Sequence, residues 1–145
     1  MNKSDMIDAL KVAKKTHQEQ MEKIEKLLEG KEVEKPTPVE KTDCRCGQMF
    51  YADKEFMVSI LGLQLFEKLD LYHEAWHKEY QKIHSIFFKE KKGLFSKLFK
   101  SKPDTLELDK AKMYYQEMKT ISEELYNVTE AALRRITALS DAKFH

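Results

Sequence analysis

Residues 71–80, Leu-Tyr-His-Glu-Ala-Trp-His-Lys-Glu-Tyr, place two histidines four positions apart in a run without proline or glycine. If the run is helical, His73 and His77 leave the same face of the helix, about one turn apart. That spacing allows two side chains to bind one metal ion. Two ligands hold a metal weakly, so a metal site needs further ligands from elsewhere in the chain. The alternative interpretation is a pair of surface histidines on an amphipathic helix.

The residues around this pair predict that the helix is packed on one side. Apolar and aromatic residues recur in steps of three and four, at Leu69, His73, Trp76, Tyr80, Ile83 and Phe87. His84 lies two turns beyond His77, about 10 Å along a helix, so we expect a packing or surface histidine there. The preceding run, residues 53–70, is apolar on nearly every side and predicts a helix that is buried on most of its surface or that faces both the core and a partner subunit. Gly62 allows either close helix contact or a bend.

Length and composition predict one helical domain covering residues 1–145. The chain has only four glycines and three prolines, which favours helix throughout. Its net charge of +1 is unlike that of a strongly basic nucleic-acid-binding protein. No apolar run reaches the roughly 18 residues of a transmembrane segment, and the first residues do not resemble a secretory signal. We therefore expect a cytoplasmic protein with no nucleic-acid partner.

The first helix is predicted over residues 4–30, with Ser4 or Asp5 as its N-cap and Gly30 just after its end. Its inward stripe contains Ile7, Leu10, Lys14, His17, Met21, Ile24 and Leu28. His17 therefore lies among apolar side chains, where a buried imidazole needs a partner. That partner is a backbone carbonyl, a carboxylate or a metal ion.

The remaining segments complete the predicted architecture. Residues 31–43 form a proline-containing linker, residues 44–90 contain a cysteine segment and the histidine helix, residues 91–103 form a second linker, and residues 104–141 form the last helix. Asp104 or Thr105 is the expected N-cap of the last helix. Four long helical segments predict an all-α fold, an antiparallel four-helix bundle with a short extra helix that carries the cysteine.

The second linker belongs to a basic segment with interleaved aromatic residues, residues 89–103. One interpretation is an amphipathic segment that docks on a membrane surface or on a partner. The other is a helical turn that folds its aromatic side chains over the end of the bundle.

Two cysteines flank Arg45 in the sequence Asp-Cys-Arg-Cys-Gly at residues 43–47. If Asp43 caps a short helix, Cys44 lies in its first turn, where the helix dipole favours the thiolate that binds metal. The alternative is that Cys44 and Cys46 are small buried apolar residues. A disulfide between residues this close would be strained. In cytoplasm, thiols or metal ligands are the expected states.

Together, His17, Cys44, His73 and His77 form a candidate set of three imidazoles and one thiolate. In a bundle, the middle of the first helix can face the segment that carries His73. Zn²⁺ prefers nitrogen and sulfur ligands in tetrahedral geometry, so this set suits zinc.

At these residues the chain resembles the chemoreceptor zinc-binding (CZB) family. That family reads H-x-x-(aromatic or Leu), then C-x-(apolar)-G-x-(aromatic or apolar), then H-x-x-x-H, with about two dozen residues in each gap. Here the three elements are residues 17–20, 44–49 and 73–77, and each gap contains 23 residues. Two positions depart from the pattern: Gln20 replaces an apolar residue after the first histidine, and Cys46 replaces the apolar residue before the glycine.

The resemblance implies a zinc-binding regulatory domain of bacterial signal transduction, in chemotaxis or cyclic-di-GMP signalling. It implies His17, Cys44, His73 and His77 as the zinc ligands. Members of the family are attached to chemoreceptors or diguanylate cyclases or stand alone, and often form homodimers. They respond to zinc or to oxidants such as hypochlorous acid through the liganding cysteine. We expect Cys46 to act as a resolving thiol or as a substitute ligand.

Two other function classes remain open from the sequence. One is a di-iron or hemerythrin-like bundle that binds oxygen or acts in redox reactions. Glu74-Ala75-Trp76-His77 reads E-x-x-H, a motif of di-iron bundles, although a second copy is absent from the sequence. A metal-free helical dimerisation or adaptor module would use the same histidines and cysteines for packing. We expect no enzyme activity, because the sequence contains no phosphate-binding loop and no nucleophile and base pair.

Overall fold

Helices make up nearly all of the structure, a computed structural model that describes residues 1–31, 33, 40–88 and 104–144. The described residues form five α-helices and one short 3-10 helix, with no strand among them. In chain order these are α1 (Lys3–Leu28), α2 (Arg45–Ala52), α3 (Lys54–Leu61), α4 (Leu63–Phe87), α5 (Thr105–Ala138) and η1 (Asp141–Lys143). The prediction of an all-α fold is confirmed.

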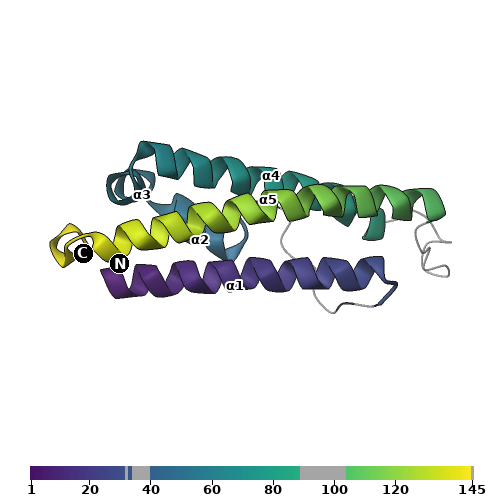
Figure 1. Cartoon of the computed structure of the whole chain (residues 1–145), viewed down its shortest axis with the longest axis horizontal. Helices are drawn as coiled ribbons and strands as arrows, with labels where there is room; N and C mark the ends of the chain where they lie inside the picture. The colour runs from purple at the N-terminus through teal and green to yellow at the C-terminus, as the bar shows by residue number, and fades with distance from the viewer. Residues whose placement is uncertain (32, 34–39, 89–103, 145) are drawn as a thin grey trace.

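The long helices α1, α4 and α5 lie lengthwise beside one another (Figure 1). The colours in Figure 1 show that α5 runs in the opposite direction to α1 and α4. The largest contact is that between α4 and α5, and α1 also packs on α5. The short helices α2 and α3 lie toward the end of the molecule where α1 and α4 begin. The segment predicted as residues 44–90 is thus divided among three helices.

Local hydrogen bonds explain where the long helices begin and end. The first helix begins at Lys3 because the Asn2 side chain accepts a hydrogen bond from the Asp5 backbone N–H, so the prediction of Ser4 or Asp5 as the N-cap is wrong. Gly30, with φ +83°, follows the C-cap of α1 as predicted. Asp104 caps α5 by accepting from the Glu107 N–H at 2.7 Å.

A break at Gly62 divides the apolar run of residues 53–70. Gly62 has φ +83° and ψ 151°, a conformation that residues with a Cβ rarely adopt, and it separates α3 from α4. The Arg135 side chain of α5 fixes this break, because its Nε donates to the Ile60 carbonyl at 2.7 Å. The break lets α3 turn away from the axis of α4 and cover the end of the core.

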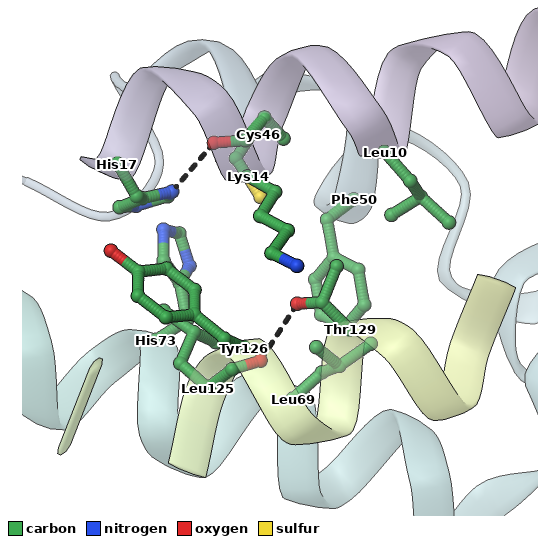
Figure 2. Close-up of a pocket in the computed structure, with 11 residues that line it drawn as sticks. Leu10, Lys14, His17, Cys46, Phe50, Leu69, His73, Leu125, Tyr126 and Thr129 are labelled. Atoms are coloured by element: carbon green, nitrogen blue, oxygen red, sulfur yellow. Dashed lines mark hydrogen bonds between the residues drawn. The ribbon is translucent and has the colours of Figure 1, made fainter. Parts of the chain in front are cut away.

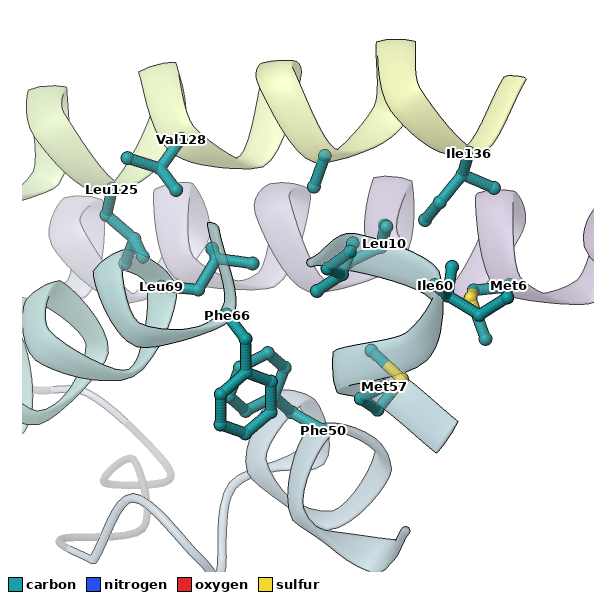
Figure 3. Close-up of a cluster of buried hydrophobic side chains, with 12 residues drawn as sticks. Met6, Leu10, Phe50, Met57, Ile60, Phe66, Leu69, Leu125, Val128 and Ile136 are labelled. Carbon is teal, nitrogen blue, oxygen red and sulfur yellow. The ribbon is translucent and has the colours of Figure 1, made fainter. Parts of the chain in front are cut away.

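Two separate clusters of apolar side chains form the core. One cluster joins the first turns of α1 to α2, α3, the start of α4 and the end of α5 (Figure 3). Its members are Met6, Leu10, Phe50, Met57, Ile60, Leu61, Phe66, Leu69, Leu125, Val128, Ala132 and Ile136. The other cluster lies further along the long helices and consists of Met21, Ile24, Trp76, Tyr80, Ile83, Tyr115 and Met118. His17 follows Leu10 and precedes Met21 on the buried side of α1, so it lies between the clusters.

The predictions about the two linkers and about the number of domains are not tested by the described residues. Most of the linker at residues 31–43, and all of residues 89–103, lie outside the described residues, so both interpretations of the basic aromatic segment stay predictions. The single domain over residues 1–145 also stays a prediction. None of the helices in the described part of the chain is long and apolar enough to cross a lipid bilayer.

The core predicts a contrast between two positions on α1. Ile24 is 1% exposed and Val12 is 42% exposed. Ile24→Ala should lower the free energy of unfolding by about 2–5 kcal/mol, because it leaves a cavity in the second cluster. Val12→Ala is the control and should change it by less than about 0.5 kcal/mol. Urea denaturation measures both, and equal losses would contradict the assigned core.

Candidate metal centre

The four residues that the sequence singles out meet at one point inside the molecule. His17 comes from α1, Cys44 is the N-cap of α2, and His73 and His77 lie one turn apart on α4. Each offers one nitrogen or sulfur atom, and these four atoms all lie within 4.8 Å of one another. All four residues are buried. The structure therefore brings together the predicted set in a group that can hold a metal ion.

The α1 backbone determines which nitrogen of His17 is available. His17 Nδ1 lies 3.1 Å from the Ala13 carbonyl oxygen. A carbonyl only accepts hydrogen bonds, so Nδ1 carries the proton and Nε2 keeps its lone pair. The neutral ring can therefore present Nε2 as a metal ligand.

Cys44 is itself the cap of α2, and the prediction that Asp43 caps this helix is wrong. The Cys44 sulfur accepts a hydrogen bond from the Gly47 N–H at 3.2 Å, so it lies at the positive end of the helix. As a thiol, Cys44 donates to the Lys41 carbonyl at 3.3 Å. The turn from Lys41 to Gly47 thus directs the sulfur toward α4.

The distances around His73 fit a shared ion. Its Nε2 lies 3.2 Å from the Cys44 sulfur and 3.2 Å from His77 Nε2. Tetrahedral zinc, with bonds of about 2.0 Å to nitrogen and 2.3 Å to sulfur, separates neighbouring ligand atoms by about 3.3–3.6 Å. Where two ligand atoms lie as much as 4.8 Å apart, they would approach each other by about 1.2–1.5 Å on binding an ion.

Burial favours the neutral form of His17 and His73, which is the form that binds metal. It lowers the pKa of His17, against the opposing effect of the Ala13 carbonyl. For His73, burial and then the positive charges of His17, His77 and Lys41 lower the pKa to about 2. Burial raises the pKa of the Cys44 thiol although the Gly47 N–H opposes this. These shifts favour the neutral forms of His17, His73 and Cys44, and a divalent cation would displace the Cys44 thiol proton on binding.

Trp76 is the member of the second apolar cluster that packs against the histidines. Its ring centroid lies 5.0 Å from that of His17 and 4.9 Å from that of His77. The indole N–H donates to the Ser122 hydroxyl at 3.1 Å, and the residue has no exposed surface. This packing excludes water from one side of the group, which strengthens electrostatic interactions there.

Cys46 lies outside the four-atom group. Its side chain is partly exposed and, with His17 and His73, lines a cavity of about 20 Å³ (Figure 2). That volume has room for about one water molecule. Burial, and then the neighbouring Cys44 sulfur, raise the pKa of the Cys46 thiol to about 12. Its role as a resolving thiol or substitute ligand stays a prediction.

Glu74 pairs with lysine side chains, although it completes the E-x-x-H motif. Its side chain is 44% exposed and lies near Lys41 at 3.7 Å and Lys78 at 3.9 Å. It does not belong to the group of possible metal ligands in the described residues. His84 is also separate from that group, as predicted, and contacts Tyr80 and Phe88.

Sequence reasoning missed Tyr51, which contacts His73, and Asp70, which contacts Tyr51. Tyr51 Oη lies 3.3 Å from His73 Nδ1, and it donates a hydrogen bond to Asp70 Oδ1. Asp70 precedes His73 by three residues on the same helix. Residues with this spacing share a face of the helix, so the sequence could have indicated that Asp70 lies near His73. Tyr51 comes from α2, and nothing in its local sequence indicates the contact.

Gly47 permits a close backbone approach that positions Cys44. A Cβ at this position would lie 1.6 Å from the Lys41 carbonyl oxygen. Gly47→Ala should displace the turn that holds the sulfur, lower the free energy of unfolding by about 1–3 kcal/mol and weaken binding of added Zn²⁺. Gly30→Ala is the control, since it strains the backbone at a remote site with no atom within 4 Å. It should lower stability without changing Zn²⁺ affinity, and unchanged affinity in Gly47→Ala would contradict the assignment.

Neutral buried histidines predict a pH dependence for the metal-free protein. Because folding lowers the pKa of His17 and His73, the unfolded chain binds more protons below about pH 6.5. Their contribution to stability is present above that pH and is lost as the pH falls. The free energy of unfolding, measured in chelator between pH 7 and 5.5, should fall with a slope approaching about 1.4 kcal/mol per pH unit for each histidine. His73→Gln should make the fall shallower, and a flat profile in the unsubstituted protein would contradict the prediction.

Comparison with protein-family models, with curated proteins and with solved structures finds no match to this chain. The resemblance to the CZB family therefore rests on the three motifs between residues 17 and 77, and it stays a prediction.

Proposed function

We propose that this chain is a zinc-binding regulatory domain in which His17, Cys44, His73 and His77 bind one Zn²⁺. One observation carries the proposal: four residues from three separate segments place three nitrogen atoms and one sulfur atom within 4.8 Å in a buried layer. That donor set suits zinc, whereas Mg²⁺ and Ca²⁺ prefer oxygen ligands. Four protein ligands would fill a tetrahedral site and leave no position for a substrate, so we propose a regulatory role and no enzyme activity.

The same proposal includes the biological setting that the CZB resemblance implies. The chain would act in the cytoplasm of a bacterium, as a homodimer, with a chemoreceptor or a diguanylate cyclase as partner. Its fold would be the antiparallel four-helix bundle of that family, with α2 and α3 together occupying the position of one helix. The opposed directions of α5 and its two long neighbours support this arrangement.

The geometry suggests how such a domain would respond to a signal. When bound, zinc supplies a cross-link between three segments of the chain and keeps the Cys44 sulfur deprotonated. Cys44 lies at the start of a short helix, whereas His73 and His77 belong to a helix of 25 residues. Cys44 is therefore the ligand whose release requires the smallest rearrangement, and α2 would move with it.

Oxidation of Cys44 would cause that release. Its thiolate and hypochlorous acid would form a sulfenic acid and chloride, with oxygen transferred to sulfur and two electrons to chlorine. The sulfenic acid is a poorer zinc ligand than the thiolate, because it has lost the negative charge on sulfur. The α2 segment would then detach from α4 and transmit the signal.

Metal content tests the proposal directly. Protein purified without chelator should contain one zinc per chain, measured by atomic emission, with little iron. Cys44→Ser and His77→Ala should lose most of the zinc in the presence of a competing chelator. The matched controls Cys46→Ser and His84→Ala replace residues outside the four-atom group and should retain it.

Thermal unfolding supplies an independent measure. At a zinc concentration 100 times the dissociation constant, binding adds about 2.7 kcal/mol to stability. Removing zinc with a chelator should therefore lower the Tm by roughly 10 °C, and should leave the Tm of Cys44→Ser nearly unchanged. Absence of zinc, with a Tm that is insensitive to chelator, would instead favour a metal-free adaptor module, and two irons per chain would favour the di-iron alternative.

A further inference from the structure

We infer that Tyr51 and Asp70 are positioning residues that set the affinity of the site for zinc by fixing the tautomer and the orientation of His73. This inference rests on the proposed function and deepens it, because it assigns a role to residues that do not touch the ion.

The argument begins with the nitrogen that His73 would use. Its Nε2 faces the Cys44 sulfur and His77 Nε2, both at 3.2 Å, so this atom must offer its lone pair to an ion. A neutral imidazole then carries its proton on Nδ1. That proton needs an acceptor, because His73 is only 3% exposed.

Tyr51 supplies the acceptor. Its Oη lies 3.3 Å from His73 Nδ1, and the two rings stack with an interplanar angle of 23°. The hydroxyl proton of Tyr51 goes to Asp70 Oδ1, so the Tyr51 oxygen has a lone pair free to accept from His73. The reverse arrangement would need a lone pair on Nδ1 and a proton on Nε2, and His73 could then not bind the ion.

Asp70 fixes the direction of this chain of hydrogen bonds. Its carboxylate accepts from Tyr51 and from Lys41 Nζ at 3.0 Å. A carboxylate only accepts, so it determines that the Tyr51 proton points away from His73. Hydrogen bonds from histidine ligands toward a carboxylate raise the basicity of the ligand and hold its ring in place.

The network also connects two ligands that lie on different segments. Lys41 binds Asp70 through its side chain, while its carbonyl oxygen contacts the Cys44 sulfur at 3.3 Å. The turn that carries Cys44 is therefore attached to α4 at the residue that orients His73. His17 needs no such network, because the Ala13 carbonyl of its own helix accepts its Nδ1 proton.

Zinc affinity, measured by competition with a chromogenic chelator, tests the inference. Tyr51→Phe and Asp70→Asn should each weaken zinc binding by roughly 10- to 100-fold. Because the two residues act in series, the double variant should lose little more zinc affinity than whichever single variant binds zinc more weakly. A double variant with fully additive losses would contradict action in series.

Matched controls separate this role from general stability. Tyr115→Phe removes the hydroxyl of a tyrosine that is buried outside the four-atom group, and Glu130→Gln breaks a comparable ion pair with Lys14 at 2.6 Å. Both should keep the affinity of the unsubstituted protein. Urea unfolding of the metal-free variants measures how much each substitution lowers the free energy of unfolding. A positioning role requires that the free energy of zinc binding falls by more than this amount.

Nitrogen-15 NMR of the zinc-bound protein gives a readout that does not depend on the variants. The His73 ring should show a protonated Nδ1 and a metal-bound Nε2, and a proton on Nε2 would overturn the inference. Tyr51→Phe and Asp70→Asn with the affinity of the unsubstituted protein would overturn it too, while leaving the proposed function intact. Failure of the unsubstituted protein to bind zinc would instead refute the proposed function.

Discussion

The structure depends on how three imidazoles and one thiol are accommodated in a layer from which water is largely excluded. Burial of polar groups is unfavourable unless each one finds a partner. Backbone groups satisfy part of this requirement, since the Ala13 carbonyl accepts from His17 and the Gly47 N–H donates to Cys44. The Nε2 atoms of His73 and His77, however, face each other at 3.2 Å, where two neutral rings can place only one proton. A cation that accepts all the lone pairs at once resolves this constraint better than any set of protons.

The helices that carry the site could be predicted because their apolar periodicity is strong. Steps of three and four residues placed His17 on the buried stripe of one helix and His73 on that of another. The resemblance and the donor chemistry added Cys44. The convergence of these residues is a property of packing between helices, and no local pattern could demonstrate it.

The features that sequence reasoning missed are set by atoms that are distant in the chain or by alternative local hydrogen bonds. Asn2 competes successfully with Ser4 as the cap of α1, because Asn2, Ser4 and Asp5 all offer a side-chain oxygen that can accept from a backbone N–H. Cys44 replaces the expected Asp43 cap because the sulfur faces the Gly47 N–H. The contact of Tyr51 with His73 depends on how α2 docks against α4, which a one-dimensional pattern does not encode.

The division of the apolar core has a consequence for cooperativity. Each apolar cluster contains residues from α1, α4 and α5, and the layer of polar ligands separates the clusters along these helices. The cluster around Phe66 and the cluster around Trp76 can therefore behave as distinct units of local opening, with different protection of their backbone amides against hydrogen exchange. The intervening layer is the element that couples them. If the proposed zinc binds in this layer, its loss would weaken that coupling and let the two clusters fluctuate more independently, so that a change at one small site would alter the motions along all three long helices.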